Sequence, residues 1–376
     1  MDMNLFNNDI FKQALADVRA EIDEASERKV NIFGDPWYLK YFRWNDTPNT
    51  EDEFTTLLDT MNFDIAASTI NRNSPSPLRG LDKPKSVKQQ LFYHSHTYKI
   101  EEETITNLGK QLRMLPNNSA GRRKAYDLYA KALRNLRTKG VNGIHNRMDI
   151  IILTLLSNKG VYTVNSTTDP ESPLAGTTIN FGFDSAHEAT FSIPWTEENI
   201  ETVDVYRDIF DFANGANRPL AKILMRQEQL NYALRTPKLR HLINSLQFQE
   251  MPIDQAKLNT FLQQNNLPVI EVVNKIARVQ SGDKTTEFQP WTLGALVGIP
   301  AGQLGTIESG FMPSELGARS PKANLQWYGR IEMYDWISDI TDGSDYTEYL
   351  MTSALAAPAV NQIRNIYAGN VLATNG

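Results

Sequence analysis

The chain has 376 residues, of which 41% are hydrophobic and 22% are charged, and it has a formal net charge of −6 and no cysteine. A chain of this length exceeds one compact core, so we expect two or more lobes. The lack of cysteine excludes disulfides, thiolate catalysis and cysteine-bound zinc, and the acidic balance argues against a protein whose overall charge grips nucleic acid.

The sequence contains no pattern typical of a membrane helix or of an export signal. No stretch approaches the roughly 18 apolar residues of a membrane helix. The N-terminus, with Asp2 and Asp9, lacks the basic and then apolar pattern of a signal peptide. We therefore expect a soluble protein without a membrane partner that is not secreted by a standard route.

Residues 2–29 have the apolar spacing of an amphipathic helix, with Phe11, Leu15 and Ile22 in one row. The breaker Gly34-Asp35-Pro36 follows, and then comes an aromatic cluster. Its members are Trp37, Tyr38, Tyr41, Phe42 and Trp44. So much aromatic surface needs a covering surface, either the core of the same chain or a neighbouring subunit.

Residues 63–73 and 86–100 are predicted strands, and the second alternates well. Between them lies SPSPLRGLDKPK, whose prolines and glycine punctuate regular structure. The two segments predict a long, projecting two-stranded arm. Such an arm is marginally stable alone in water, so we expect its tip to rest on another surface.

The strongest helical signal covers residues 119–158, with Ser119 as a plausible cap and apolar residues every three or four positions. Gly140 and Gly143 each cost about 1 kcal/mol inside a helix. The pattern predicts one long helix or two nearly continuous ones.

The second half alternates short helices and strands, which makes the chain a mixed α+β protein. Helices are predicted at 196–213, 226–235 and 237–246 and after a cap at Asp254. Strands are predicted at 221–225, 268–279, 293–299, 325–335 and 359–372.

Acidic and basic residues are concentrated in different segments of the sequence. Residues 1–60 have a net charge of −7, residues 66–100 of +5, and residues 110–140 of +8. Charged stretches are most often solvated faces, but an acidic and a basic arm also suit complementary contacts between copies. The 110–140 segment could instead face nucleic acid, although no nucleic-acid-binding motif accompanies it.

No motif for chemistry stands out. Phosphate loops, dinucleotide fingerprints and nucleophile elbows are absent from the sequence. His94 and His96 share a strand face and could ligate a metal, but an exposed polar face is the preferred interpretation because no third ligand is evident. We assign no catalytic, cofactor-binding or metal-binding residue, expect no cofactor, and expect that the protein is not an enzyme.

Three C-terminal stretches carry a family resemblance: Trp291–Glu315 (WTLGALVGIPAGQLGTIESGFMPSE), Leu325–Asp339 (LQWYGRIEMYDWISD) and Ser353–Leu372 (SALAAPAVNQIRNIYAGNVL). Together with the order of segments, they resemble the major capsid proteins of tailed bacteriophages, of the Hong Kong 97-type fold. The lambda-type head proteins, the capsid E family, are the most similar group.

The resemblance implies an α+β Hong Kong 97-type capsid fold with five segments. These are an N-terminal arm (1–60), an E-loop (61–110), a peripheral domain (111–200) with a spine helix at about 117–160, an axial domain (201–310) and return strands (311–376).

The resemblance also implies the function. The chain would be a head protein that self-assembles into an icosahedral shell around double-stranded DNA, without covalent cross-links. Its partners would be copies of itself in pentamers and hexamers, with scaffold, portal and decoration proteins and weak contact with packaged DNA as further candidates. It would assemble in the host cytoplasm and reside in the virion. Predicted subunit contacts are Trp37, Tyr38, Tyr41, Trp44, Arg72, Arg79, Lys83 and Lys85.

Two other readings of the sequence stay open. One is a non-viral or accessory assembly protein, such as an encapsulin-like cage, a portal or a tail component. The other is an enzyme with an unrecognised site in the 201–310 lobe.

Overall fold

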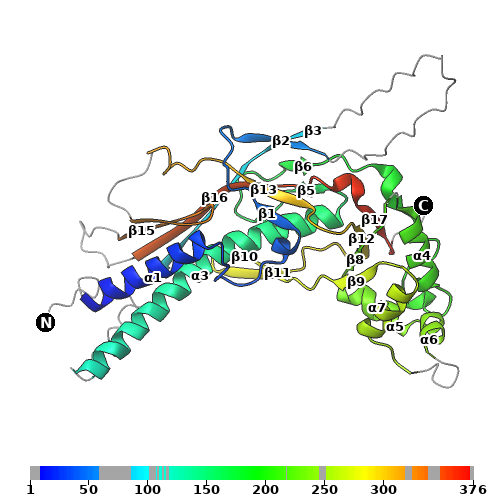
Figure 1. Cartoon of the computed structure of the whole chain (residues 1–376), viewed down its shortest axis with the longest axis horizontal. Helices are drawn as coiled ribbons and strands as arrows, with labels where there is room; N and C mark the ends of the chain where they lie inside the picture. Colours follow the sequence, from blue (N-terminus) through cyan, green and yellow to red (C-terminus); the bar gives the residue numbers. More distant parts are fainter. Residues whose placement is uncertain are drawn as a thin grey trace, which may run out of the picture.

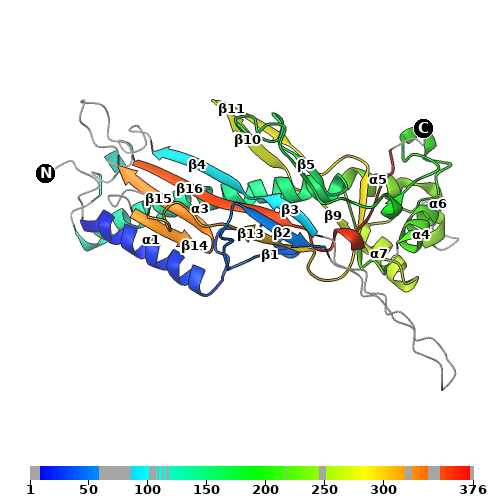
Figure 2. The same ribbon diagram turned by 90° about the horizontal axis from the view of Figure 1, so that it is seen from above.

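A computed structural model gives the structure of the chain, and it describes residues 9–58, 86–100, 118–216, 218–244, 251–317, 324–337 and 348–372, with a few single residues between 107 and 115. The molecule is elongated and has two lobes that share one long helix (Figures 1 and 2). It is α+β, as predicted from the sequence. None of the described helices is long and apolar enough to cross a membrane.

The first lobe contains a six-stranded sheet in the order β1-β13-β16-β15-β14, with β4 on the other edge of β16. Its strands are β1 (Phe42–Trp44), β4 (Phe92–Ile100), β13 (Gly305–Ser309), β14 (Asn324–Tyr328), β15 (Ile331–Ile337) and β16 (Glu348–Ala359). The long strand β16 organises the sheet, because β4 pairs with it from Glu348 to Ala356 while β13 and β15 share its opposite edge.

Helix α3 (Ser119–Ser157) is continuous through both glycines, which answers the question left open by the sequence. Asn118 caps it, since its side chain accepts a hydrogen bond from the backbone N–H of Gly121 at 2.9 Å. The apolar C-terminal end, Ile150–Leu156, is buried in the largest core cluster, so packing rather than intrinsic propensity holds this part of the helix.

The two glycines bring α3 against the sheet. A Cβ at Gly140 would lie 2.3 Å from Oγ1 of Thr352 in β16, and one at Gly143 would lie 1.9 Å from Cε1 of His96 in β4. Both residues are therefore points of close approach rather than helix breaks.

Helix α1 (Asp9–Glu27) lies beside the N-terminal half of α3 and over β14 (Figure 2). Its apolar face, with Phe11, Val18 and Ile22, is buried in a cluster with Tyr129 and Leu133 of α3. The predicted helix over 2–29 is confirmed over this range, and its first residues lie outside the described part of the chain.

The second lobe contains a five-stranded sheet in the order β7-β17-β12-β8-β9, flanked by helices. The strands are β7 (Glu188–Ala189), β8 (Lys222–Met225), β9 (Val269–Val272), β12 (Ala295–Ile299) and β17 (Tyr367–Asn370). The helices are α4 (Val205–Gly215), α5 (Gln227–Arg235), α6 (Pro237–Ile243) and α7 (Gln255–Gln264), and they gather at the end of the molecule away from α1 (Figure 1).

Three two-stranded sheets and several short helical turns complete the fold. The strand pairs are β2 (Glu53–Leu57) with β3 (Ser86–Gln90), β5 (Val161–Thr163) with β6 (Thr178–Asn180), and β10 (Ala277–Ser281) with β11 (Lys284–Phe288). The 3-10 turns are η2 (Trp37–Lys40), η3 (Ser185–His187), η4 (Glu197–Asn199) and η6 (Ile363–Asn365).

Four predicted strands are divided in the structure. Residues 86–100 form β3 and β4 in different sheets, residues 268–279 span β9 and β10, and residues 325–335 form the hairpin β14–β15. The hairpin turns at Gly329, whose φ of 57° is the conformation that a tight turn requires and that glycine adopts readily. The predicted strand at 359–372 covers only the end of β16 and then β17, which lies in the second lobe.

The predicted two-stranded arm is tested only in part. Its first strand, 63–73, lies outside the described residues, and β4 pairs with β16 in the main sheet. The strand β3 instead pairs with β2. The predicted helix at 196–213 is also shorter, because Asp204 caps α4 and the residues before it form η4 and a loop.

Candidate functional site

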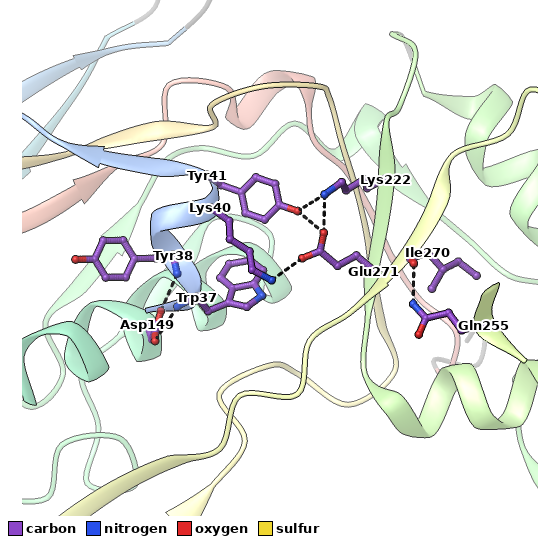
Figure 3. A network of polar contacts seen from close by, with 9 residues as sticks. All are labelled: Trp37, Tyr38, Lys40, Tyr41, Asp149, Lys222, Gln255, Ile270 and Glu271. Carbon is purple, nitrogen blue, oxygen red and sulfur yellow. Dashed lines mark hydrogen bonds and ion pairs between the residues drawn. The ribbon is translucent and has the colours of Figure 1, made fainter. Parts of the chain in front are cut away.

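The 3-10 turn η2 lies where α3 meets the second lobe, and a polar network fastens it there (Figure 3). The buried carboxylate of Asp149 in α3 accepts hydrogen bonds from the backbone N–H groups of Tyr38 at 2.8 Å and Trp37 at 3.3 Å. It also pairs with Lys275, Nζ to Oδ2, at 2.8 Å. A carboxylate from a distant helix thus caps the start of this turn, where free N–H groups favour negative charge.

The hydroxyl of Tyr38 links three elements. It accepts a hydrogen bond from Nε1 of Trp44 at 2.8 Å and lies 2.7 Å from Nδ1 of His145. The indole can only donate, and the direction of the hydrogen bond between Tyr38 and the imidazole follows the tautomer of His145. Burial lowers the pKa of His145 to about 4, helped by the nearby Lys275, and burial raises the pKa of Tyr38 well above its ordinary value.

The carboxylate of Glu271 in β9 gathers three donors from different parts of the chain. It accepts from the hydroxyl of Tyr41 at 2.7 Å, from Nζ of Lys222 at 2.7 Å, and from Nζ of Lys40 at 3.2 Å. Burial tends to raise the pKa of Glu271, but these hydrogen bonds outweigh it and leave that pKa below its ordinary value. The N-terminal segment is thereby joined to β8 and β9 of the second lobe.

These pKa shifts indicate what the network does. Burial and the hydrogen bond to Glu271 raise the pKa of Tyr41 to about 12. The pKa of Lys222 is also raised, since its hydrogen bonds to Glu271 and Tyr41 outweigh its burial. A proton-transfer group works best with a pKa near the working pH, and these shifts move away from it. The network holds fixed charges that clamp three elements together.

The aromatic cluster predicted to contact other subunits is covered by the chain itself. Trp37, Tyr38 and Tyr41 expose 7% of their surface or less, and Trp44 is half-buried. Of the two surfaces that could cover them, the structure shows the core of the same chain. The other predicted contact residues, Arg72, Arg79, Lys83 and Lys85, lie outside the described residues.

The histidine pair on β4 is not an exposed polar face, contrary to the preferred interpretation of the sequence. His96 packs against Gly143 of α3, and Nε2 of His94 donates to the carbonyl of Ala356 at 3.2 Å. Burial lowers the pKa of His94 to about 3, and the charge of Arg147 contributes. Within the described ranges, no group of three or more histidine and carboxylate side chains could hold a metal ion.

Part of the expected charge complementarity lies inside one chain. Arg134 of α3 pairs with Glu21 of α1, Nε to Oε2, at 2.7 Å, and Tyr126 donates to Asp17 at 2.8 Å. Below these contacts, Asp335 of β15 pairs with Arg137 at 2.8 Å and with Arg19 at 2.7 Å. The acidic N-terminal helix therefore neutralises part of the basic helix of its own chain.

The buried pair Arg137–Asp335 was missed in the sequence. Arg137 is four residues after Leu133 and four before Val141, so it lies within the apolar face of α3, and it exposes only 1% of its surface. A charged residue on an apolar helix face is rarely buried without a partner of opposite charge. The position of Arg137 between Leu133 and Val141 therefore could have predicted a buried ion pair from the sequence.

A hollow of about 760 Å³ opens in the second lobe. Its lining includes Trp195, Gln229, Asn231, Tyr232 and Ile253. The rings of Trp195 and Tyr232 stack with centroids 6.0 Å apart. The sequence contained no motif that marked this place, because its lining comes from four separate segments.

No family model and no curated protein matches the chain. Among solved structures, the putative capsid protein of a prophage of E. coli CFT073 aligns with a TM-score of 0.56 at 15% identity, covering 94% of this chain and 98% of that chain. A phage-related protein from Bordetella bronchiseptica RB50 aligns with a TM-score of 0.46 at 12% identity, covering 94% and 97%. The capsid of Myoviridae Phage XM1 gives a TM-score of 0.44 at 10% identity, covering 91% and 93%.

The likeness to the prophage protein defines the fold of this chain over nearly its whole length. The chain has a capsid-protein fold, the Hong Kong 97 type that the C-terminal stretches resemble. The predicted fold is therefore confirmed.

Proposed function

We propose that the chain is the major capsid protein of a tailed bacteriophage, and that it self-assembles into an icosahedral shell around double-stranded DNA. One observation carries the proposal: the shared fold covers 94% of this chain and 98% of the prophage capsid protein. Because proteins of one fold can have different functions, the proposal is tested by whether the purified chain assembles into shells.

In this proposal the role of the protein is structural, its partners are copies of itself in pentamers and hexamers, and it resides in the virion after assembly in the host cytoplasm. The first lobe corresponds to the peripheral domain with α3 as the spine helix, and the second lobe to the axial domain. The clamp at Asp149 and Glu271 then fixes the angle between the lobes, which a closed shell requires to be nearly constant.

We propose further that the E-loop cations Arg79, Lys83 and Lys85 pair with acidic surface on the next subunit. The described part of the chain offers such surface, since Glu198 in η4 and Glu201 in the loop before α4 are both exposed, whereas Glu197 already pairs with Arg235 of the same chain. Pairing of this kind sets register and partner choice.

The E-loop proposal is tested by reversing the charge of those three residues together and sedimenting the full chain. Folded monomers or capsomers without shells are the expected result. Shells of normal yield at moderate salt would show that the pairing is not needed.

The exposed cations of α3 supply a surface for packaged DNA. Arg122, Arg123, Lys124, Lys131 and Lys139 are exposed, and none of them has an ion pair within the described part of the chain. Lys124, Lys131 and Lys139 lie on one side of α3, because successive helical residues are rotated by about 100°, and we call them the basic stripe. We propose that this stripe makes weak, sequence-independent contact with phosphates, which needs no base-reading motif.

A further inference from the structure

Two asparagine–glycine pairs occur among the described residues, and the fold places them in very different surroundings. Asn142-Gly143 lies in the middle of the 39-residue helix α3, whereas Asn214-Gly215 forms the last two residues of α4. Glycine has no Cβ to shield its backbone nitrogen, so this nitrogen can reach the side-chain amide of the asparagine before it once the helical conformation is released.

The pair at the end of α4 is easily released. The side chain of Asn214 is exposed and makes no hydrogen bond with any residue that the structure describes. The chain leaves the helix at Ala216, whose ψ of 134° is extended. Because the ends of helices fray, only the terminal turn has to open before the backbone N–H of Gly215 is free.

Gly215 is also a point of close approach between α4 and β17. A Cβ at this position would lie 2.5 Å from the hydroxyl of Tyr367, the first residue of β17. A larger residue would push this ring aside, so the contact favours glycine after Asn214. The reactive pair therefore accompanies the packing of α4 on the sheet of the second lobe.

The pair in α3 is held closed. Asn142 is half-buried, and a Cβ at Gly143 would lie 1.9 Å from Cε1 of His96 in β4. To free the N–H of Gly143, α3 would have to open in its middle and separate from the main sheet. Openings of that kind are much rarer than the fraying of a helix end.

We propose that Asn214 is a site of spontaneous deamidation and that Asn142 is protected from it. The backbone nitrogen of Gly215 attacks Cγ of Asn214 and forms a C–N bond, while the side-chain nitrogen leaves as ammonia with the proton that the attacking nitrogen loses. Water then opens the succinimide ring at either of its two carbonyls, which gives aspartate or isoaspartate. No other reactant is required.

The product changes the charge of the second lobe at one defined point. The new carboxylate lies at the C-terminus of α4, where the free carbonyl groups already make the potential negative. Asp211, three residues earlier, is an exposed carboxylate on the same side of the helix. Both effects disfavour the added charge, so the last turn should loosen and the contact between Gly215 and Tyr367 should weaken.

Peptide mass spectrometry of the full chain, stored at neutral pH and sampled over weeks, tests the proposal. Trypsin releases Asn214 in the peptide 208–222 and Asn142 in the peptide 140–147, so one digest measures both pairs. The first peptide should gain the mass difference between an amide and an acid at Asn214 and separate into aspartate and isoaspartate forms. Its reaction should be at least about tenfold faster than that of Asn142.

Two controls make the result decisive. In the chain unfolded in guanidinium chloride, both pairs should react at similar rates, because the difference between them comes from the fold. Asn214→Gln should keep the peptide 208–222 unmodified. The proposal is overturned if the two pairs react equally in the folded chain, if Asn214 stays intact while the unfolded chain reacts, or if the mass gain persists in Asn214→Gln. The measurement does not depend on shell assembly, so it is independent of the proposed function.

Discussion

Gly143 of α3 lies directly under the imidazole of His96 in β4, and a Cβ at Gly143 would be 1.9 Å from Cε1 of that ring. The long helix and the edge strand β4 therefore lie closer together than any residue larger than glycine at position 143 would allow. This relationship explains why a glycine that weakens an isolated helix is tolerated in the middle of this one.

Replacing Gly143 by alanine should lower the free energy of unfolding. Alanine gains about 1 kcal/mol in helix propensity, but overpacking a fitted contact costs about 1–3 kcal/mol, and a 1.9 Å approach is at the severe end. Urea unfolding measures the difference, with Asn135→Ala on the exposed face of α3 as the control. Adding His96→Ala should recover part of the loss in a double-mutant cycle, and a stabilised Gly143→Ala variant would contradict the steric account.

Asp149→Asn should loosen the N-terminal segment. The change removes the charge that caps the turn at Tyr38 and leaves Lys275 without its carboxylate, and breaking a buried pair costs about 3–5 kcal/mol. Faster proteolysis within residues 9–44 should accompany the loss of stability. Asp46→Asn, at an exposed ion pair with Lys29, is the control and should change stability by less than about 0.5 kcal/mol. Equal effects at Asp46 and Asp149 would rule out the clamp.

Stability should fall as the pH falls below about 6.5. The folded pKa of His145 is about 4 and that of an unfolded histidine is about 6.5, so between these values the unfolded chain binds more protons. The stabilisation is complete above the unfolded pKa and is lost progressively toward the folded one. At pH 5 the loss from His145 alone is about 2 kcal/mol. Urea midpoints between pH 7.5 and 5 give the slope, which His145→Gln should reduce; an unchanged slope would remove His145 as its source.

Two arginines one turn apart on α3 should differ sharply. Arg137→Met leaves the buried Asp335 with a weaker set of partners and should cost about 3 kcal/mol or more, whereas Arg134→Met breaks a half-exposed pair with Glu21 and should cost less than about 1 kcal/mol. Added salt should weaken only the exposed pair. Similar losses in the two variants would mean that the buried network does not anchor α1.

Reversing three charges of the basic stripe should separate DNA contact from assembly. Lys124, Lys131 and Lys139 changed together to Glu should leave shells intact but weaken retention of DNA fragments and flatten its salt dependence, because each phosphate contact contributes about 0.9 to the slope. The same reversal at Lys12, Arg43 and Lys284, which are also exposed, controls for total charge. Equal loss of binding in both triple variants would indicate a non-specific charge effect.

Local sequence patterns predicted most helices and strands, but few of the contacts between them. The apolar stripe of α3 and the cap of α7 at Asp254 depend on neighbouring residues, so both were predictable. The continuity of α3 was not, because it depends on Thr352 and His96, which are far away in sequence. Alternation persists through Gly329, so the β14–β15 hairpin looked like one strand.

The site was less predictable than the fold. The aromatic residues Trp37, Tyr38 and Tyr41 were recognised as anchors, but a sequence does not show whether an anchor binds its own core or another copy. The clamp joins Tyr41, Lys222 and Glu271 across more than 200 residues of chain, and no spacing rule brings such residues together.

The central claim is that this chain builds a closed shell, and electron microscopy of the purified full-length protein tests it most directly. Negative-stain images should show uniform icosahedral particles, or rings of five and six copies that convert to shells when the concentration is raised. A monodisperse small particle at every concentration would contradict the claim, and tubes or open rings alone would indicate an accessory assembly protein instead.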